Sequence, residues 1–538
     1  MTDSDRVYFF DSTLRDGQQT QGVDFSVADK RALALALDQL GATYIEGGWP
    51  GANPSDDAFF ADPPPLSQAR LIAFGMTHRA GRSAENDPGL AAVLNAGADG
   101  VCLVGKAWDF HVDVALGVAR SAYLDSIAGS LAHAAARSGE VMFDAEHFFD
   151  GYKANPDFAL AALDAAREGG AHWLVLCDTN GGTLPEEVAR IVGEVAERFP
   201  GTGLGIHCHD DTGNAVANSL AAVRAGARQV QGTLNGLGER CGNANLIPII
   251  ATLALKSDFD TGLTDAQLQE LTPVSRLLDE RLNRTPARNA PYVGESAFAH
   301  KGGLHVSAVD KDPRTYEHID PARVGNRRHI VVSDQSGRAN ILARFREIGV
   351  EVESDDPQVA ALVEEVKARE FEGYAYDGAE ASFELLARRA LGQVGEYFTL
   401  QRFRVMDDRR WNARGELVCE SEATISMHVA GRDMMTVATG NGPVNALDRA
   451  LRKALVEIYP ELSDMTLTDY KVRILTPQAG TGAVTRVMIE SKDGQGHYWT
   501  TVGVSANIID ASFNALRDGL TWKLHRDGAV PAGAGAGV

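Results

Sequence analysis

Apolar positions in residues 5–240 repeat one pattern, in which a short β-rich run leads through a polar or glycine-containing segment into an amphipathic stretch. Strands that alternate with helices and read as continuous apolar runs indicate a parallel sheet covered on both faces. Eight such units predict an α/β fold, a closed TIM (β/α)₈ barrel. The runs are Val7–Phe10, Thr43–Glu46, Leu71–Gly75, Gly100–Val104, Val141–Phe143, Trp173–Cys177, Leu204–Cys208 and Gln229–Leu234. Helical patterns between them include Val27–Leu40, Phe158–Glu168, Pro185–Arg198 and Asn214–Ala225.

The pattern changes after the barrel. Helical segments are expected at Ala266–Asn283, Asp356–Arg369 and Gly378–Leu391, separated by irregular stretches rich in glycine and arginine. We therefore expect a barrel domain over residues 1–265, followed by helical linker subdomains over 266–395 that contribute to the active site.

The last part of the chain contains a weak internal repeat. Thr436–Leu455 and Thr501–Leu520 are similar, and each follows alternating runs typical of strands. Each copy is predicted to form a βββα unit, and two copies predict a C-terminal α+β domain over residues 396–525 of a kind suited to regulation or dimerisation. The low-complexity residues 526–538 are expected to be a disordered tail.

Acidic residues outnumber basic ones. The 538-residue chain contains 73 Asp and Glu against 51 Lys and Arg, a formal net charge of −22. This charge argues against a general nucleic-acid or anionic-membrane binder. The first six residues show no signal-peptide pattern, and no apolar run reaches the ~18 residues of a membrane span. Five cysteines without a CxxC pair indicate reduced thiols, so a cytoplasmic location is expected.

Reactive side chains follow the predicted strands repeatedly. Barrel enzymes place their chemistry at the carboxyl ends of the strands, where the βα loops begin. No GxGxxG follows the first strand and no GxxxxGK[ST] occurs, so a nucleotide-binding fold has no motif support. The side chains at these ends are Asp11, Arg15, Asp16, Glu46, Asp144, Glu146, Asp178, Thr179, Asn180, His207, His209, Asp210, Asp211 and the segment Asn235–Asn243.

His207 and His209 are candidate metal ligands. Side chains two residues apart on a strand share one face, so both imidazoles can converge on one point. Asp16 can add a carboxylate because strands one and eight meet when the barrel closes, and Asn243 can add a neutral oxygen. Such a set can hold a divalent metal as a Lewis acid, and it leaves Mn²⁺, Mg²⁺, Zn²⁺ and Co²⁺ open. The alternative is a histidine pair that only hydrogen-bonds within the barrel.

Other barrel residues are candidates for substrate binding and catalysis. Arg15 can bind a carboxylate or stabilise developing negative charge, unless it is an ordinary ion-pairing arginine. Thr179 can bind a substrate carboxylate or serve as a turn residue, and His78 is a further substrate-binding candidate. Glu146 is the best general-base candidate, with a structural carboxylate as the alternative. Asp178 and Glu46 have the same ambiguity with weaker support.

The segment Ala297–Val306 places His300 and His305 in a glycine-containing stretch outside the barrel. One of these histidines can reach a barrel mouth as an acid or base, and Tyr316 can act as an acid or donor. The ordinary alternative for all three is packing or solvent exposure.

Four motifs resemble one family, the isopropylmalate/homocitrate/citramalate synthases, which are metal-dependent acyl-CoA-condensing TIM barrels. They are Asp11–Gln19 (DSTLRDGQQ), His207–Asn218 (HCHDDTGNAVAN), Asn235–Asn243 (NGLGERCGN) and Phe298–His305 (FAHKGGLH), and the resemblance extends over residues 5–520. Four further stretches look like the citramalate synthases of this family: Ile45–Pro54, Phe143–Tyr152, Cys177–Thr183 and Phe371–Tyr374.

The resemblance implies an acyltransferase that condenses acetyl-CoA with pyruvate to give (R)-citramalate and CoA, at the start of a threonine-independent route to isoleucine. It implies that Asp16, His207 and His209 hold the metal with Asn243 near it, and that Arg15 and Thr179 contact the 2-oxo acid. Glu146 and His305 would transfer protons, assisted by Tyr316. It also implies a homodimer and a C-terminal effector domain inhibited by isoleucine or leucine. Candidate CoA contacts are Lys301, Arg79 and Arg240.

Other functions remain possible from the sequence. A 2-isopropylmalate synthase would use 2-oxoisovalerate, and an acyl-CoA lyase would run the reverse cleavage on a similar barrel. The long C-terminal repeat favours a regulated synthase over a lyase. A non-catalytic amino-acid-binding regulator would be expected to lack a metal ligand or Arg15, and none is missing. A biotin-dependent carboxyltransferase is disfavoured because no AMKM-like carrier motif occurs.

Overall fold

The chain forms two compact units. The computed structural model describes residues 5–300, 303–330, 342, 344–346, 349, 357–411 and 413–531. The first unit contains residues 5–298 and Ile319–Arg328, and the second contains Ala299–His318 and the described residues from His329 onward. Lys301 and most of the predicted tail, residues 532–538, lie outside the described residues. The two units are described separately below.

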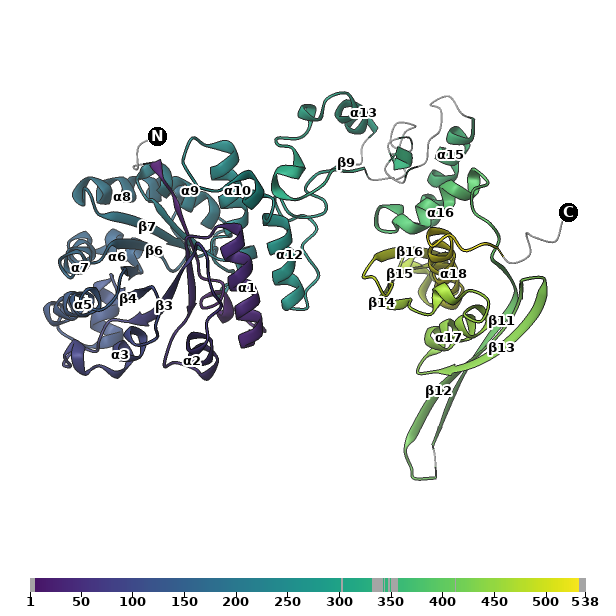
Figure 1. The fold of residues 1–538 in the computed structure, drawn as a ribbon, viewed down its shortest axis with the longest axis horizontal. Coiled ribbons are helices and arrows are strands. Elements are labelled where there is room, and N and C mark those ends of the chain that lie inside the picture. Colours follow the sequence, from purple (N-terminus) through teal and green to yellow (C-terminus); the bar gives the residue numbers. More distant parts are fainter. Residues whose placement is uncertain are drawn as a thin grey trace. The chain divides into compact units, whose positions relative to one another are not determined.

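The first unit is a closed barrel of eight strands in sequential order, as predicted (Figure 1). All neighbouring strands run parallel, and the barrel closes where β1 pairs with β8. The strands are β1 (Tyr8–Asp11), β2 (Tyr44–Gly48), β3 (Arg70–Met76), β4 (Gly100–Lys106), β5 (Val141–Glu146), β6 (Trp173–Asp178), β7 (Gly203–Cys208) and β8 (Gln229–Gly232). β8 ends two residues earlier than expected, because Leu234–Gly236 forms a 3₁₀ turn instead of continuing the strand.

Helices cover the outside of the barrel. They begin at ordinary signals: Ser26 and Asp29 form a capping box on α1, and prolines start α2, α3, α7 and α8. The helices of the barrel are α1 (Val27–Leu40), α2 (Pro54–Ala61), α3 (Pro88–Leu94), α4 (Asp109–His111), α5 (Arg120–Ala135), α6 (Phe148–Ala154), α7 (Pro156–Glu168), α8 (Pro185–Arg198), α9 (Ala215–Ala225) and α10 (Leu246–Lys256).

A buried carboxylate links several strands at the end of the barrel opposite the βα loops. Glu140 precedes β5, and its Oε1 accepts hydrogen bonds from the Tyr44 hydroxyl at 2.8 Å and from the Trp173 indole N–H at 3.0 Å. Its other oxygen forms an ion pair with Arg70. These three partners stand at the beginnings of β2, β6 and β3, so one side chain ties four strands together at the end opposite the βα loops.

Beyond the barrel, the expected helix over Ala266–Asn283 is divided into α11 (Asp265–Leu268) and α12 (Leu271–Arg281). Proline has no backbone N–H and is accommodated only in the first turn of a helix. The new start at Leu271 places Pro273 in that turn, which explains the division.

The second unit begins with β9 (Ala299–His300), α13 (Gly303–Lys311) and β10 (His329–Ile330), where β9 and β10 pair in parallel. The helices α15 (Pro357–Glu372) and α16 (Glu380–Ala390) match the expected linker helices closely. Their apolar faces share a cluster with Val502 of the C-terminal repeat.

The C-terminal repeat consists of two βββα units, as predicted. The first contains β11 (Phe398–Trp411), β12 (Leu417–Val429), β13 (Arg432–Gly440) and α17 (Pro443–Leu455); the second contains β14 (Thr466–Ile474), β15 (Thr485–Lys492), β16 (Tyr498–Ser505) and α18 (Ile508–Arg526). Each sheet is antiparallel, and both helices contribute to one apolar core. The β11–β12 ribbon extends well past β13 (Figure 1). Among the described helices, none is both long and apolar enough to cross a membrane.

Candidate metal centre and active site

The turn after β1 brings Arg15 and Asp16 to the barrel mouth. The carbonyl oxygen of Ser12 accepts hydrogen bonds from the backbone N–H groups of Arg15 and Asp16, at 3.2 and 2.8 Å. The N–H and hydroxyl of Thr13 both donate to Asp11 at 2.9 Å. Burial outweighs those bonds and raises the pKa of the Asp11 carboxyl to about 7. The run of polar residues after β1 is therefore a compact turn that directs the side chains of Arg15 and Asp16 inward.

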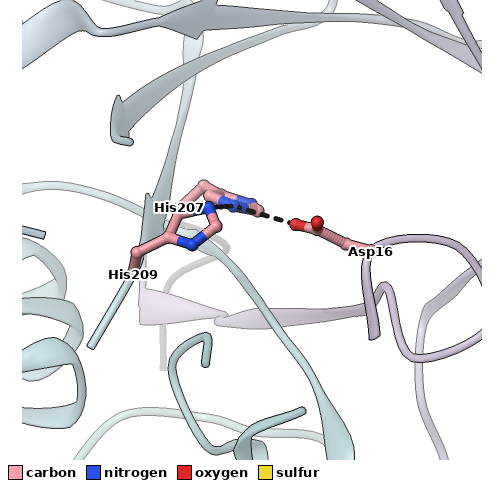
Figure 2. A group of neighbouring side chains, drawn as sticks. All are labelled: Asp16, His207 and His209. Atoms are coloured by element: carbon pink, nitrogen blue, oxygen red, sulfur yellow. Dashed lines mark hydrogen bonds and ion pairs between the residues drawn. The ribbon is translucent and has the colours of Figure 1, made fainter. Parts of the chain in front are cut away.

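His207 and His209 direct their imidazoles toward Asp16 (Figure 2). The Nε2 atoms of the two histidines lie 3.3 Å apart, and Nε2 of His207 lies 3.3 Å from Oδ2 of Asp16. Each of the three buried residues offers a ligand atom within 4.8 Å of the other two. Two imidazoles and a carboxylate are a common ligand set for divalent transition metals.

Asn243 lies beside this group. Its Nδ2 donates to Oδ2 of Asp16 at 2.7 Å, and its buried Oδ1 has no hydrogen-bond partner. An isolated β-bridge to His209 fixes its backbone. An uncompensated buried oxygen is costly, so its place next to three converging ligand atoms fits a cation that binds there.

Glycines shape the loop that carries Asn243. Gly242 has a φ of +100°, and a Cβ there would lie 2.1 Å from the carbonyl oxygen of Gly236. A Cβ at Gly238 would lie 2.4 Å from Oδ1 of Asn243. Only glycine allows these approaches, which explains the NGLGERCGN pattern.

The electrostatics of the group favour a bound cation. Burial acts to raise the pKa of the Asp16 carboxyl, but Arg15 and His207 outweigh it and hold that pKa well below its usual range. Burial, followed by the charge of His207, lowers the pKa of His209 to about 4. Burial also acts to lower the pKa of His207, yet Asp16 outweighs it and raises that pKa. At neutral pH the carboxylate is therefore ionised, and its charge is compensated by Arg15 together with either a proton on His207 or a metal ion.

Arg15 is held on three sides. Its Nε donates to Oε2 of Glu46 at 2.7 Å, and its NH1 lies 3.5 Å from Oδ1 of Asp16. Its guanidinium carbon lies 3.8 Å from the ring centroid of Phe74, within cation–π range. Glu46 is itself fully buried and accepts the Ser12 hydroxyl at 2.6 Å. A positive charge fixed in this way is preorganised to stabilise negative charge on a substrate oxygen.

Glu146 ends β5, in register with Lys106 at the end of β4, and the two side chains form an ion pair. The next residue, His147, has a φ of +58°, and its backbone N–H donates to the Thr179 hydroxyl at 2.8 Å. The loop that follows Glu146 is thus bonded to the loop that contains Thr179. No interaction described for Glu146 or Thr179 joins that residue directly to the Asp16 and histidine group.

Two other residues singled out from the sequence, His78 and Asp178, have structural contacts. The N–H of His78 donates to the Ser130 hydroxyl of α5 at 2.8 Å, and its Nδ1 bonds with the carbonyl oxygen of Arg79 at 3.1 Å. Its described contacts are therefore with α5 and its own loop. Asp178 accepts both the N–H and the hydroxyl of Thr183, at 3.2 and 2.8 Å, and so holds the turn after β6.

Arg240 ties neighbouring loops together. Its Nε and NH2 both donate to the Asp211 carboxylate at 2.8 Å, and NH2 also donates to the carbonyl oxygen of Thr179 at 2.7 Å. A bidentate pair of this kind orders the loops after β6, β7 and β8.

His305 and Tyr316 belong to the second unit and lie together there. Their ring centroids are 4.2 Å apart with an interplanar angle of 31°, and both side chains are exposed. His300 is buried, and its Nε2 lies 3.1 Å from Oε1 of Glu317. The side chains of His305 and Tyr316 are therefore accessible to a ligand, whereas the His300 side chain is paired with the Glu317 carboxylate.

Sequence reasoning missed three residues next to the site. Phe74 and Lys106 could not be predicted, because an aromatic residue or a lysine within a strand does not by itself indicate a functional site. Gln231, whose Oε1 lies 2.9 Å from Nδ1 of His207, is a polar residue within an otherwise apolar strand. That position, facing the same way as a histidine on the adjacent strand, was the available signal.

Comparison with known families agrees with the fold. Residues 6–278 match the family described as HMGL-like, residues 292–372 match the homocitrate synthase post-HMGL domain-like family, and residues 377–524 match the LeuA allosteric (dimerisation) domain. The fold and the site thus define a TIM-barrel protein of the HMGL-like class with a candidate metal centre and an attached allosteric-type domain.

Full-length relatives narrow the assignment. The chain is 49% identical to the (R)-citramalate synthase of Aquifex aeolicus, over 97% of this chain and 99% of that protein. It is 50% identical to the (R)-citramalate synthase of Geobacter sulfurreducens, over 97% and 98%. The 2-isopropylmalate synthase of Pelotomaculum thermopropionicum is more distant, at 31% over 95% and 97%. The chain belongs to the HMGL-like family and groups there with the (R)-citramalate synthases.

Proposed function

We propose that the protein is a citramalate synthase, an acyltransferase that condenses acetyl-CoA with pyruvate to give (R)-citramalate and CoA. The observation that carries the proposal is the buried group of Asp16, His207 and His209 beside Arg15, on a chain that aligns over nearly its whole length with (R)-citramalate synthases. The greater distance of the 2-isopropylmalate synthases favours pyruvate over 2-oxoisovalerate.

The metal would be held by Asp16, His207, His209 and, through its free Oδ1, Asn243. A divalent ion bound there supplies a Lewis acid that polarises the ketone of a 2-oxo acid. Mn²⁺, Mg²⁺, Zn²⁺ and Co²⁺ all accept this mixed nitrogen and oxygen set, so the proposal does not choose between them.

The side chains of the protein account for binding and proton transfer. Arg15 holds the developing negative charge on the former ketone oxygen, and Thr179 binds the 2-oxo acid carboxylate. Glu146, oriented by Lys106, removes a proton from the acetyl methyl group. The resulting carbon nucleophile forms a C–C bond to the ketone carbon, and His305 with Tyr316 returns a proton to the oxygen. Water then cleaves the thioester, releasing CoA thiol and the free acid. His78 would also bind substrate, in addition to its contacts with α5 and its own loop.

Each part of the chain would have a separate role. Residues 1–265 catalyse, the helical segments over 266–395 contribute His305 and Tyr316, and residues 396–525 regulate. The match to an allosteric dimerisation domain supports a homodimer and an amino-acid effector, which we propose to be isoleucine as the end product of the route.

The test is release of CoA thiol from acetyl-CoA by the purified protein with Mn²⁺ or Mg²⁺. The 2-oxo acids to compare are pyruvate, glyoxylate, 2-oxobutyrate, 2-oxoisovalerate and 2-oxoglutarate. Strong preference for pyruvate is expected, because a pocket closed to branched acids excludes them by clash. Preference for 2-oxoisovalerate would make the protein a 2-isopropylmalate synthase instead.

A further inference from the structure

Gln231 connects a metal-ligand candidate to a carboxylate across the barrel interior. Its Oε1 lies 2.9 Å from Nδ1 of His207, and its Nε2 donates to Oδ1 of Asp144 at 3.0 Å. Gln231 is the register partner of His207 on the neighbouring strand, whereas Asp144 comes from β5, three strands away. All three side chains are at least nine-tenths buried.

The surroundings of Gln231 fix the direction of its amide. Its Nε2 faces two acceptors, Oδ1 of Asp144 and, at 3.3 Å, Oε1 of Gln229. A reversed amide would place an oxygen against both of these oxygens. The carbonyl oxygen of Gln231 therefore faces His207 and accepts a hydrogen bond from Nδ1–H.

This bond determines which nitrogen of His207 is available. With the proton on Nδ1, the lone pair of the neutral imidazole is on Nε2, the atom that lies 3.3 Å from Asp16 and from Nε2 of His209. Metal-binding histidines are commonly oriented by a partner on the other ring nitrogen, and carboxylates are frequent partners. Here the carboxylate acts through an amide.

We propose that Gln231 and Asp144 are positioning residues that hold His207 as a metal ligand, in a carboxylate–amide–imidazole relay. The inference rests on the proposed metal centre and adds the residues that determine its affinity. Neither relay residue needs to touch substrate. Asp144 accepts a hydrogen bond from the Gln231 amide, which polarises that amide and in turn raises the basicity of Nε2 on His207.

A matched control exists on the same strand. Gln229 is two residues before Gln231 on the same face, is equally buried, and bonds with Sδ of Met142 and with Gln231 but not with His207. If these two glutamines only occupied polar space in the barrel interior, substituting either one would change the metal affinity by the same amount.

The experiment measures Mn²⁺ affinity of the full-length protein by calorimetry, without substrates, for wild type, Gln231→Met and Gln229→Met. Methionine nearly preserves the shape of glutamine and removes its hydrogen bonds. Gln231→Met is expected to weaken Mn²⁺ binding about 10- to 100-fold, and Gln229→Met by less than about threefold. Thermal midpoints of the metal-free variants, measured in EDTA, control for folding.

An exchange of the two functional groups provides a second readout that does not depend on Gln231→Met folding. The double variant Gln231→Glu with Asp144→Asn places the carboxylate directly on Nδ1–H of His207 and the amide behind it. It is expected to bind Mn²⁺ at least as tightly as wild type. Gln231→Glu alone puts two carboxylates in contact and is expected to bind more weakly than the double variant.

Equal Mn²⁺ affinity in wild type and Gln231→Met, or an equal loss in Gln229→Met, would overturn the relay while leaving the metal centre in place. Failure of the double variant to exceed Gln231→Glu would overturn it as well. Absence of Mn²⁺, Mg²⁺, Zn²⁺ and Co²⁺ binding by the wild type would instead overturn the metal assignment and the relay with it.

Discussion

Nε2 of His207 and Nε2 of His209 face each other at 3.3 Å, with the Asp16 carboxylate completing the triangle. Three nitrogen and oxygen ligand atoms of buried side chains converge on one point, and the ionised carboxylate among them favours a bound cation. This relationship leads to the first prediction.

Binding of a divalent metal should stabilise the barrel, and His209→Ala should abolish that effect. At a metal concentration of 100 times Kd, the wild type should gain about 2.7 kcal/mol of stability, because the ion binds the folded state only. The measurement is the thermal midpoint with Mn²⁺ and with EDTA, together with turnover. His133→Ala on α5 is the control and should keep the shift. Metal-dependent stabilisation that persists in His209→Ala would contradict the proposed ligand set.

Gly242→Ala should impair the site through the loop that carries Asn243. Gly242 has a φ of +100°, and an added Cβ would lie 2.1 Å from the carbonyl oxygen of Gly236, a backbone atom that shifts less easily than the end of a flexible side chain. Gly22→Ala is a matched control, since Gly22 has a φ of +77° but no atom within 4 Å of an added Cβ. Both variants carry the left-handed strain of about 1–2 kcal/mol, but only Gly242→Ala should lose metal affinity and turnover. An equal loss of metal affinity and turnover in the two variants would show that the backbone strain of a left-handed alanine, and not the contact with Gly236, causes the effect.

Glu140→Ala should destabilise the barrel without altering its chemistry. The substitution leaves the Tyr44 hydroxyl and the Trp173 indole N–H without their partner at the base of the barrel. Each lost buried hydrogen bond costs on the order of 1–2 kcal/mol, so a loss of about 2–4 kcal/mol is expected. The thermal midpoint should fall, while kcat should be unchanged because the proposed catalytic residues follow the opposite ends of the strands. Glu186→Ala, on the surface of α8, should change neither quantity, and a large drop in kcat for Glu140→Ala would contradict the separation.

Asp11 should make the barrel less stable as pH rises. Burial raises its pKa from 3.8 to about 7 in the folded protein, so the folded state retains a proton that the unfolded chain releases. The stabilising contribution of that proton is complete below the unfolded pKa and is lost as pH rises through about 7. Between pH 5 and 8 the wild type should lose about 2–3 kcal/mol relative to Asp11→Asn, which cannot ionise. Thermal midpoints of both proteins across this range test the prediction, and parallel curves would show that the Asp11 carboxyl is not perturbed.

The barrel and the C-terminal repeat could be predicted from local patterns. Continuous apolar runs such as Trp173–Cys177 and amphipathic helices are properties of neighbouring residues, and their alternation leaves few topologies that bury them. The similar segments around Thr436 and Thr501 likewise indicated two βββα units. Strand ends were less accurate: Thr233 and Leu234 were predicted as strand, whereas β8 ends at Gly232 and Leu234 begins a 3₁₀ turn.

The candidate metal ligands could also be predicted from the sequence. The two histidines are two residues apart on a strand, so their side chains share one face. The acid follows the first strand, which lies next to the eighth when the barrel closes. What the sequence could not give is the environment of these groups. The ring of Phe74 under Arg15, the ion pair of Lys106 with Glu146 and the contacts of His78 with α5 join residues from different strands and loops. Such contacts depend on the register between strands and on side-chain directions.

The sequence by itself determined that this protein has an eight-stranded barrel with polar side chains at one end, because periodicity and spacing are local and the hydrophobic effect acts on them directly. Only the tertiary structure decided that Gln231 and Asp144 stand behind His207, that Glu140 closes the base, and that Asp11 has a raised pKa. Each of these facts requires burial and a partner distant in the chain, and both arise only when the barrel closes.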